Sequence, residues 1–594
     1  MKITRTFDLL EKYKAEFNKE DAFAVKQDGS WIKYSTDEYI NYSYWFCYGI
    51  QKLGLKKGDK IVTITNNRPE WNFVDMGMAM AGIVHVPVFS TLNHKEYHYI
   101  LQHSDTKLVL VSDKKLYDLV NPLCNSIKSI QNIYSFNEID GAKNWMEIIE
   151  SGRSSEKDYK EETEIIKENI SPDDLATIIY TSGTTGQPKG VMLSHKNLVS
   201  NFISAAGVFQ LKTTDRYLSI LPLCHVGGRL GNYQTQYSGS SIYYAENMGT
   251  IAINMKEIQP QGFDAVPRIL EKIYDTVIAK GKKLNGFKKF MFFWAVKVGS
   301  KYKTPDESSW LYRKKLAIAD KLIFTKWREA LGGNIKLVGC GAACLLPHLE
   351  RIFWACNIKI INMYGLSETS PIITINRTKK PDLKLGSVGA LIKDVKVKIA
   401  DDGEIMCKGP NVMSGYYKDP ELTKSVFDKD GWFHTGDIGF LEDNKFLNVT
   451  DRKKEIFKLS TGKFIAPQLI ENTFKQSIFI DQIMIIGEHQ KFASALISPN
   501  FSYFKDWCKN ENLQYSSNEE LINLPQVINL FNDVIKKTNK TLNNHEIIKR
   551  FKLVASEWSP GGGELSPTLK LKRRNIENKY KILLDQIYPP KTDY

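Results

Sequence analysis

Short apolar runs alternate with amphipathic stretches from the N-terminus to about residue 385. Residues 60–115 contain KIVTI, a helical pattern that leads into AMAGIVHVPV, and then TKLVLVS. The same rhythm returns at LATIIYTS (175–182), RYLSILPL (216–223) and NIKLVGCG (334–341). Strands that alternate with helices at this spacing are typical of βαβ units. We therefore predict an α/β fold built on largely parallel sheets that are flanked by helices.

The pattern of apolar and polar residues changes near residue 386. KVKIADDGEIMCKG has the pattern of short strands joined by Asp and Gly turns, which is typical of a small antiparallel module. Further on, LISPNF predicts a strand and the stretch 515–545 predicts helices. A chain of 594 residues is also too long for one hydrophobic core. The predicted organisation is an N-terminal domain over 1–451, with sheet subdomains over 1–385 and a β-barrel-like module over 386–451, and a smaller, mobile α+β domain over 452–594.

Composition changes this picture little. Hydrophobic residues make up 42% and charged residues 25%, which is ordinary for a globular protein. The eight cysteines show no CxxC pair, and we expect Cys340 and Cys344 to be small buried residues in a reducing, cytoplasmic compartment. The N-terminus MKITRTFDLLEKYKAEF lacks the apolar region of a signal peptide, and no apolar run of about 18 residues predicts a membrane span.

The charge balance points to anionic partners. Lys and Arg number 81 against 67 Asp and Glu, which gives a net charge of +14. Nucleotides, acyl carboxylates, membrane surfaces and nucleic acid would all be attracted by this excess. Composition does not choose among them.

The stretch TIIYTSGTTGQPKGVMLSH (177–195) carries the clearest chemistry. A strand is predicted to end at Thr181 and a helix to begin near His195. Between them, glycines let backbone N–H groups approach phosphate oxygens, hydroxyls donate further hydrogen bonds, and a lysine supplies charge. The spacing does not fit a Walker A loop. The predicted phosphate-binding residues are Thr181, Ser182, Gly183, Thr184, Thr185, Gly186 and Lys189.

YTSGTTGQPKG resembles the phosphate-binding signature of the adenylate-forming superfamily, which contains acyl-CoA synthetases, luciferases and peptide-synthetase adenylation domains. YGLSETS (364–370) resembles the family's Y-G-x-T-E element, with Ser367 in the usual threonine place. Three further elements follow in the family's order: GEIMCKGPNVMSGYYKDPELT (403–423), DGWFHTGDIG (430–439) and DRKKEIFK (451–458). Five elements across nearly the whole chain are far more specific than one. The resemblance implies a ligase that uses ATP, Mg²⁺ and coenzyme A.

The resemblance also implies roles for individual residues. Glu368 corresponds to a carboxylate that holds Mg²⁺ at the phosphates, with Thr184 as a hydroxyl helper. Hard Mg²⁺ prefers oxygen ligands and often uses a single carboxylate, which agrees with that role. The simpler interpretation of Glu368 is a carboxylate at a helix N-terminus.

Further residues of the implied nucleotide site are spread over the chain. The adenine slot corresponds to Gly341, Ala342, Ala343, Tyr364 and Gly365, and Lys458 also corresponds to a nucleotide-site residue. Asp437 corresponds to the acceptor of the ribose hydroxyls, with Arg452 as its companion, although a Gly-Asp pair is more often only a turn. His225 follows a strand-like run and corresponds to a residue beside the carboxylate, although a lone histidine is more often a buried, hydrogen-bonded residue.

The C-terminal stretch ELSPTLKLKRR (564–574) resembles the family's T-x-S-G-K-x-x-R element. This places Lys570 as the lysine that contacts the α-phosphate and the substrate carboxylate. Thr568 and Leu569 stand where the family has Ser-Gly. Lys572, Arg573 and Arg574 are interpreted as solvated charges that could help to bind the phosphates of coenzyme A. Lys454, in DRKK, matches the hinge about which the C-terminal domain swings.

Residues 430–458, VPRILEKI (266–273) and LGGNIKLVGCGAA (331–343) resemble the long-chain fatty acyl-CoA synthetase branch. The expected partners are therefore a long-chain fatty acid, ATP and coenzyme A, without nucleic acid. FKKFMFFWAVKVGSKYK (287–303) allows two interpretations: an interfacial segment that would place the protein peripherally on the inner face of a membrane, or an aromatic core helix with snorkelling lysines.

Other functions remain open at this point. One is an acyl-AMP ligase that loads an acyl carrier protein, which the family marks by an insertion that is not obvious in this sequence. Another is a coenzyme A ligase for a different carboxylic acid. A non-catalytic descendant should have lost Glu368, Lys189 or Lys570, and the chain keeps all three.

Overall fold

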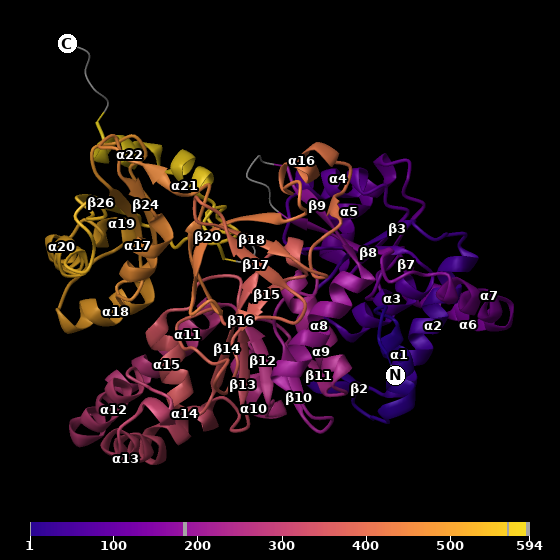
Figure 1. Ribbon diagram of the computed structural model, residues 1–594, viewed down its shortest axis with the longest axis horizontal. Coiled ribbons are helices and arrows are strands. Elements are labelled where there is room, and N and C mark those ends of the chain that lie inside the picture. Colours follow the sequence, from indigo (N-terminus) through magenta and orange to yellow (C-terminus); the bar gives the residue numbers. More distant parts are fainter. Residues whose placement is uncertain (1, 182–186, 567–568, 590–594) are drawn as a thin grey trace, which may run out of the picture. The chain divides into compact units, whose positions relative to one another are not determined.

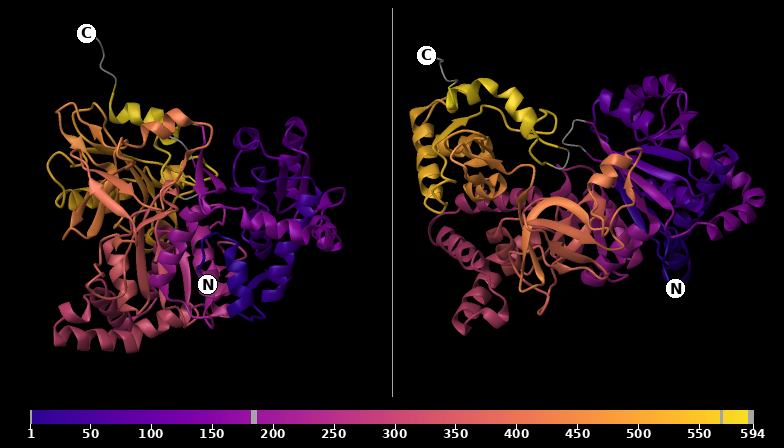
Figure 2. Two further views of the ribbon diagram at one scale, coloured as in Figure 1. Left: turned by 45° about the vertical axis from the view of Figure 1, so that its right-hand side comes forward. Right: turned by 45° about the horizontal axis from the view of Figure 1, so that its top comes forward.

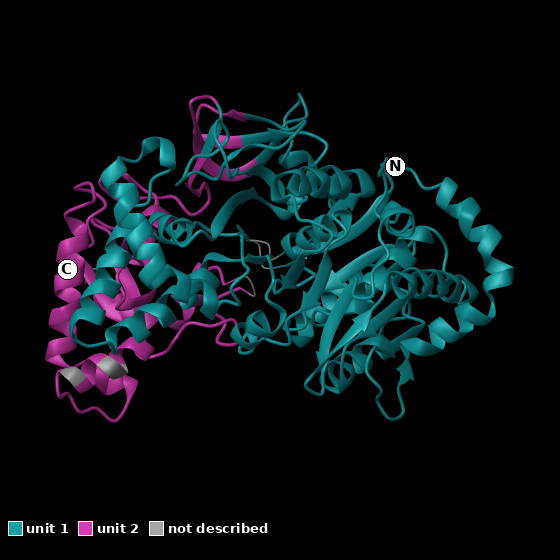
Figure 3. Cartoon of the chain, turned by 90° about the horizontal axis from the view of Figure 1, so that it is seen from below, with its two compact units in different colours: residues 1–397, 406–434, 445–447 teal, residues 398–405, 435–444, 448–594 magenta. Residues whose placement is uncertain are grey.

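The computed structural model describes residues 2–181, 187–566 and 569–589, and the chain forms two compact units. Figure 3 distinguishes them by colour. Unit 1 comprises residues 1–397, 406–434 and 445–447, and unit 2 comprises residues 398–405, 435–444 and 448–594.

The larger sheet of unit 1 is mostly parallel. Nine of its strands follow in the order β16 (Ala390–Leu391), β15 (Ile372–Ile375), β14 (Lys359–Gly365), β13 (Leu337–Cys340), β12 (Gly262–Ala265), β10 (Arg216–Ser219), β11 (Ser241–Tyr244), β1 (Phe23–Gln27) and β2 (Ser30–Tyr34). Pairing is parallel from β14 to β1 and antiparallel at both margins, between β1 and β2 and from β14 to β16. This confirms the predicted α/β class.

The second sheet of unit 1 is also parallel at its centre. Its order is β19 (Gly415–Tyr416), β9 (Lys189–Ser194), β8 (Leu175–Thr181), β4 (Val84–Val88), β3 (Lys60–Ile64), β5 (Leu108–Val111), β6 (Asn132–Ser135) and β7 (Lys143–Asn144). The predicted strands KIVTI, TKLVLVS and LATIIYTS are β3, β5 and β8. β9 was missed by the sequence analysis, and it pairs antiparallel with both β8 and β19.

Helices cover both faces of these sheets, as Figures 1 and 2 show. Those of unit 1 are α1 (Asp8–Glu16), α2 (Thr36–Lys52), α3 (Pro69–Met80), α4 (His94–His103), α5 (Lys114–Ser126), α6 (Trp145–Ser154), α7 (Glu156–Glu168), α8 (His195–Phe209), α9 (Val226–Tyr237), α10 (Ile251–Ile258), α11 (Pro267–Lys282), α12 (Gly286–Gly299), α13 (Trp310–Ala319), α14 (Thr325–Ala330), α15 (Pro347–Ala355) and α16 (Pro420–Ser425). Short turns of helix are η1 (Pro305–Glu307), η2 (Asp320–Phe324) and η3 (Ser367–Thr369).

Side chains alternate between the two faces of each strand, so neighbouring residues pack into different hydrophobic cores. Tyr217 of β10 packs into a core that it shares with α8 and α9, whereas the next residue, Leu218, packs into a core with α10, α11 and α12. Successive side chains of a strand point to opposite faces, so each strand serves two cores. The sheet thereby fixes the position of the helices on both of its sides.

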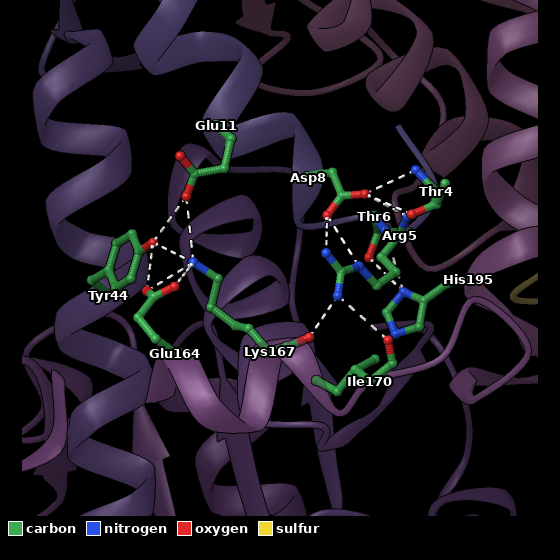
Figure 4. A network of polar contacts seen from close by, with 10 residues as sticks. All are labelled: Thr4, Arg5, Thr6, Asp8, Glu11, Tyr44, Glu164, Lys167, Ile170 and His195. Atoms are coloured by element: carbon green, nitrogen blue, oxygen red, sulfur yellow. Dashed lines mark hydrogen bonds and ion pairs between the residues drawn. The ribbon is translucent and has the colours of Figure 1, made fainter. Parts of the chain in front are cut away.

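A polar network fixes the start of α8, the helix that follows the predicted phosphate loop (Figure 4). The Thr6 hydroxyl lies 3.0 Å from Nδ1 of His195, the first residue of α8, and Arg5 donates to the carbonyl of Lys167. Burial, together with the charge of Arg229, lowers the pKa of His195 to about 4. His195 is therefore neutral at pH 7 and acts as a buried anchor.

The small antiparallel module contains β17 (Lys396–Ile399), β18 (Glu404–Lys408), β20 (Phe433–Glu442) and β21 (Phe446–Arg452). Its strands follow the order β17-β18-β20-β21, and the division between the two units runs through them. This order is open, so the described residues of the module form no closed barrel. The barrel-like form expected from the sequence is corrected accordingly.

The rest of unit 2 is a small α+β structure. It contains β22 (Phe457–Lys458), β23 (Phe464–Ile465), α17 (Pro467–Phe474), β24 (Ile480–Ile486), β25 (Ser494–Pro499), α18 (Phe501–Asn510), α19 (Asn518–Leu521), α20 (Pro525–Asn539), β26 (Arg550–Leu553), α21 (Arg573–Lys579) and α22 (Lys581–Ile587). β25 pairs antiparallel with β24 and parallel with β26. The strand predicted at LISPNF and the helices predicted within 515–545 are confirmed.

Candidate nucleotide and carboxylate site

The β8–β9 hairpin holds the ends of the predicted phosphate loop. Thr181, the last residue of β8, pairs with Lys189, the first residue of β9. Ser182, Gly183, Thr184, Thr185 and Gly186 lie outside the described residues. The hairpin therefore brings both ends of the loop to one place, and Lys189 extends from a strand instead of a long loop.

A carboxylate, a phenol and a lysine gather beside this hairpin. Glu368 lies on η3, and its Oε1 accepts a hydrogen bond of 2.9 Å from the Tyr416 hydroxyl. The Lys189 ammonium lies 5.4 Å from the centre of the Tyr416 ring. Burial raises the pKa of Tyr416, and the neighbouring Glu368 raises it further, so the phenol keeps its proton and donates a hydrogen bond to the carboxylate. Tyr416 thus links Glu368 to the strand pair that carries Lys189.

Backbone contacts hold η3 in place. The Met413 amide donates to the Glu368 carbonyl at 2.8 Å. The side chains of Asn201 and Asn411 both donate to the carbonyls of Thr369 and Ile372, just beyond η3. Glu368 therefore sits on a turn that is fastened from α8 and from the 411–413 segment, and it is not at the N-terminus of a regular α-helix.

The predicted adenine residues meet at one edge of the larger sheet. β13 and β14 run parallel with Cys340 opposite Asn362, so Gly341–Ala343 and Tyr364–Gly365 follow the carboxyl ends of neighbouring strands. A Cβ on Gly365 would lie 1.7 Å from the Pro371 carbonyl oxygen, so only glycine fits there. Ligands of open α/β sheets bind outside such carboxyl ends. In contrast to the expectation of two buried cysteines, Cys340 is buried and Cys344 is exposed.

His225 lies at the same edge, at the N-terminus of α9. Its Nδ1 accepts a hydrogen bond of 3.1 Å from the Gly227 amide, and the side chain is half-buried. His225 is therefore the N-cap of α9, since its side chain satisfies one of the first backbone N–H groups of the helix. This fixes the imidazole with Nε2 as the nitrogen that does not cap the helix.

A buried ion network holds α9 one turn beyond His225. Asp75 of α3 accepts hydrogen bonds from Arg229 at 2.5 Å and from the Tyr233 hydroxyl at 2.5 Å, and it contacts His85 Nδ1 at 2.6 Å. Burial alone would raise the pKa of Asp75, but Arg229 and His85 hold it below its ordinary value. Because these groups are fully buried, loss of one partner would leave an uncompensated charge.

In unit 2 the structure brings Asp437 and Arg452 together. Asp437 of β20 is buried, and its Oδ1 lies 3.0 Å from Arg452 Nε at the end of β21. Asp437 lies inside a strand, so the simpler interpretation of a Gly-Asp turn does not apply. Nearby, Lys453 pairs with Glu404 at 2.7 Å and with Asp402 at 2.6 Å.

The two lysines that follow this strand are exposed. Lys454 lies in the turn after β21, and Lys458 ends β22 with its ammonium 5.4 Å from the Phe464 ring centre. Asp451, just before the turn, is buried. Burial raises the pKa of Asp451 to about 7, and the carboxylates of Glu471 and Glu455 add to the effect.

Arg573 is not the solvated charge that the sequence analysis expected. Its Nε lies 3.0 Å from Glu455 and its second terminal nitrogen lies 2.8 Å from Glu471, which is itself buried. Burial alone would lower the pKa of Arg573, but these two carboxylates raise it. The guanidinium therefore joins the start of α21 to the turn after β21 and to α17.

Lys570 lies three residues before this clamp, on a tight turn. The Ser566 amide donates to the Lys570 carbonyl at 2.8 Å, and the Lys570 amide donates to the Ser566 hydroxyl at 3.0 Å. Leu569 adopts a left-handed backbone with φ of 61°, where the family has glycine. The side chain of Lys570 is exposed, whereas Lys572 caps α21 through its backbone. Thr568 lies outside the described residues.

Comparison with known proteins decides the family. The model of the AMP-binding enzyme family matches residues 13–417, and that of the AMP-binding enzyme C-terminal domain matches residues 454–591. The chain belongs to the AMP-binding enzyme family. ATP and coenzyme A are substrates of the acyl-CoA ligases in this family.

Several curated members of the AMP-binding enzyme family resemble this chain over most of its length. A long-chain-fatty-acid–CoA ligase of Mycobacterium bovis is 30% identical over 567 residues, covering 94% of this chain and 93% of that protein. The peroxisomal long chain acyl-CoA synthetase 7 of Arabidopsis thaliana is 30% identical over 578 residues, covering 91% of this chain and 79% of that protein.

Solved AMP-binding structures share the fold. The adenylation domain of a carboxylate reductase from Mycobacterium chelonae has a TM-score of 0.74 at 20% identity, covering 98% of this chain and 91% of that chain. An anthranilate CoA ligase in complex with anthranoyl-AMP has a TM-score of 0.71 at 16% identity, covering 98% of both chains. A large N-terminal part with sheets and helices and a smaller C-terminal part are common to these structures.

In the described parts of the chain, no three His, Cys, Asp or Glu side chains converge as ligands for an ion. Mg²⁺ is commonly held by one or two carboxylates together with substrate phosphates, and the single carboxylate of Glu368 fits that donor set. Across the same residues, no helix has the length and apolar character that crossing a membrane requires.

Proposed function

We propose that this AMP-binding enzyme is a long-chain fatty acid:CoA ligase. Fatty acid and ATP give acyl-adenylate and pyrophosphate, and coenzyme A then gives acyl-CoA and AMP. The observation that supports the substrate class is the likeness to curated long-chain ligases over 94% of the chain, which includes both family domains. The two units supply different parts of this reaction.

The first half-reaction uses the fixed site of unit 1. A fatty acid carboxylate oxygen attacks the α-phosphorus of ATP, one P–O bond forms, and the bond to pyrophosphate breaks. Lys189 and the loop residues 182–186 bind the phosphates, Thr184 would assist Glu368 as a hydroxyl ligand of the metal, and Tyr416 orients the Glu368 carboxylate. Glu368 would hold Mg²⁺, which supplies positive charge to the phosphate oxygens when bound.

Further roles are proposed for residues within each unit. The adenine lies in the slot of Gly341, Ala342, Ala343, Tyr364 and Gly365, and the Asp437 carboxylate accepts the ribose hydroxyls with Arg452 and Lys458 as companions. His225 lies beside the fatty acid carboxylate. Lys570 contacts the α-phosphate and the attacking carboxylate, where its ammonium stabilises negative charge as it builds on phosphorus.

The second half-reaction requires a change of arrangement. The coenzyme A thiol attacks the acyl carbonyl, the C–S bond forms and AMP leaves as the mixed anhydride breaks. Lys570 and the thiol cannot both occupy the space beside one carbonyl. The mobile domain 452–594 therefore turns about Lys454, a position in the turn after β21 where a change in φ and ψ is absorbed.

Pyrophosphate release across a panel of fatty acids, with and without coenzyme A, tests the proposal. A long-chain ligase releases pyrophosphate with long-chain acids and forms the thioester when coenzyme A is added. If the thioester forms only with other carboxylic acids, the substrate class is not long-chain fatty acids. Adenylate that is transferred to an acyl carrier protein and not to coenzyme A would favour the acyl-AMP ligase instead.

A further inference from the structure

Residues 280–330 concentrate the positive charge of the chain. This segment contains fourteen Lys and Arg and four Asp and Glu, so it carries +10 of the total charge of +14. It covers the end of α11, all of α12 and α13, and the helical turns up to α14. We call this segment the basic hairpin. It belongs entirely to unit 1 and contains none of the proposed site residues.

Large apolar side chains stand exposed on the same hairpin. On α12, Phe287 is 74% and Phe290 is 64% exposed, and their rings stack on each other with centres 6.4 Å apart. On α13, Trp310 is 58% and Leu311 is 63% exposed. Ile318 and Leu322 are also exposed further along. Single exposed apolar residues are ordinary, but a group gathered on α12, α13 and the adjoining η2 marks an interaction surface.

The opposite side of the hairpin is firmly packed. Phe292, Ala295 and Val298 of α12 are buried in the core beneath the larger sheet. The Tyr312 hydroxyl of α13 donates to the Val298 carbonyl at 2.9 Å and joins the two helices, which lie together in Figures 1 and 2. The interpretation of 287–303 as a core helix therefore holds for its buried residues. It does not account for Phe287 and Phe290.

The combination of lysine and aromatic side chains on the basic hairpin indicates the kind of partner that it binds. Lys288 and Lys289 lie between Phe287 and Phe290, and all four side chains are exposed. Lys314 places its ammonium 4.0 Å from the centre of the Trp310 ring. Lysines attract the phosphates of a lipid surface, while Phe, Leu and Trp enter the boundary between headgroups and acyl chains. Duplex nucleic acid offers phosphates but no apolar layer for these side chains.

We propose that the basic hairpin docks the protein on the surface of a bilayer that contains anionic lipids. The docking is peripheral and takes place through α12 and α13. It deepens the proposed function and rests on it for its purpose, because long-chain fatty acids dissolve in bilayers far better than in water. The binding itself can be measured without any ligase activity.

Co-sedimentation of the full chain with lipid vesicles tests the proposal. One set of vesicles contains only phosphatidylcholine, and the other contains equimolar phosphatidylcholine and phosphatidylglycerol. We expect binding to the anionic vesicles that is about tenfold or more tighter than to the neutral ones and that weakens as salt is added. Equal binding to both vesicles, or binding to neither, would overturn the proposal.

Paired variants locate the surface. Lys288→Glu with Lys289→Glu should reduce binding to anionic vesicles about tenfold or more, and Phe287→Ser with Phe290→Ser should reduce it at every salt concentration. The matched control is Lys114→Glu with Lys115→Glu, an exposed lysine pair in the first turn of α5, which makes the same charge change elsewhere. A control that loses as much binding as the hairpin variants would show that only total charge matters, and the assignment to the hairpin would be wrong.

Ligase activity on fatty acid supplied in solution separates this proposal from the function. The hairpin variants should keep that activity, which also shows that they are folded. If the unchanged protein binds anionic vesicles but forms no acyl-CoA, the proposed function fails and the docking stands. If an acidic carrier protein or duplex DNA competes for the hairpin while vesicles do not bind, the assignment to lipid is wrong.

Discussion

The surroundings of Lys189 and Lys570 differ in ways that match their proposed tasks. Lys189 begins β9, a strand that pairs with β8 on one side and β19 on the other, and it lies against the ring of Tyr416, whose hydroxyl holds Glu368. Lys570 is exposed on a tight turn, three residues before Arg573, which pairs with Glu455 and Glu471. A group that must bind phosphate in every step can be built into a sheet. A group that must act in one step and leave in the next has to be carried on a part that moves as a whole.

The sharpest way to break this comparison is to remove the moving lysine. Lys570→Ala should slow ATP-dependent pyrophosphate release by roughly 10²–10³, because one preorganised contact to the developing charge is lost. Conversion of supplied acyl-adenylate to acyl-CoA should be nearly unchanged. Both half-reactions are measured separately, and Lys572→Ala is the matched control. Should Lys572 prove essential instead, the register of this element is off by two residues.

Restricting the backbone of the turn at Lys454 tests the proposed movement of the C-terminal domain. Lys454→Pro fixes φ at the proposed hinge and should leave adenylate formation close to normal, while thioester formation falls by about 10² because the coenzyme A arrangement is not reached. Single-turnover assays of each half-reaction provide the measurement. Equal loss of both steps would indicate a folding defect or a hinge at another residue.

The fixed site is tested through its carboxylate. Glu368→Gln keeps the hydrogen-bond acceptor for Tyr416 but removes the charge, so about 10- to 100-fold more Mg²⁺ should be needed for half-maximal pyrophosphate release. Tyr416→Phe is the companion variant and should raise that requirement by a smaller factor. An unchanged Mg²⁺ dependence in Glu368→Gln would remove this residue from the metal site.

The two units should also respond to pH in opposite directions. His195 in unit 1 has a pKa lowered to about 4, so its contribution to stability is present above its ordinary value of 6.5 and is lost as pH falls through about 4. Asp451 in unit 2 has a pKa raised to about 7, so its contribution is present below its ordinary value of 3.8 and is lost as pH rises through about 7. Each slope should be at most about 1.4 kcal/mol per pH unit.

Hydrogen exchange resolved by segment can follow both units in one sample. His195→Asn should flatten the acid-side loss of protection in α8, and Asp451→Asn should flatten the loss toward neutral pH in β21 and α17. If His195→Asn leaves the acid-side loss in α8 unchanged, the loss does not arise from this buried imidazole. Likewise, if Asp451→Asn leaves the loss of protection in β21 and α17 unchanged, that loss does not arise from the Asp451 carboxyl group.

The hydrophobic periodicity of the sequence predicted the strands whose apolar runs are distinctive by themselves. KIVTI, LATIIYTS and LISPNF became strands because their apolar runs match the buried strands of sheets. β9 was missed because KGVMLS follows Gly and Pro and because one of its two partner strands, β19, is distant in sequence. The same limit hid Arg573, whose carboxylate partners lie 118 and 102 residues away.

The resemblance of the motifs identified candidate site residues but not the residues that hold them in place. Asp437 and Arg452 were named together from the sequence, and the structure places them 3.0 Å apart. Tyr416 lies within the quoted GEIMCKGPNVMSGYYKDPELT element, yet nothing in that element indicates that its hydroxyl would reach Glu368, 48 positions earlier. The roles of all these residues in catalysis stay predictions until the variants are measured.

The Arg573 clamp has a consequence for processing of the chain end. A protein trimmed after Lys572 would retain every residue proposed to touch ATP, including Lys570, and its sequence would still carry all five family elements. It would nevertheless leave Glu471 buried without its guanidinium and release the tail from Glu455. Removal of α21 and α22 should therefore impair the enzyme as severely as loss of Lys570.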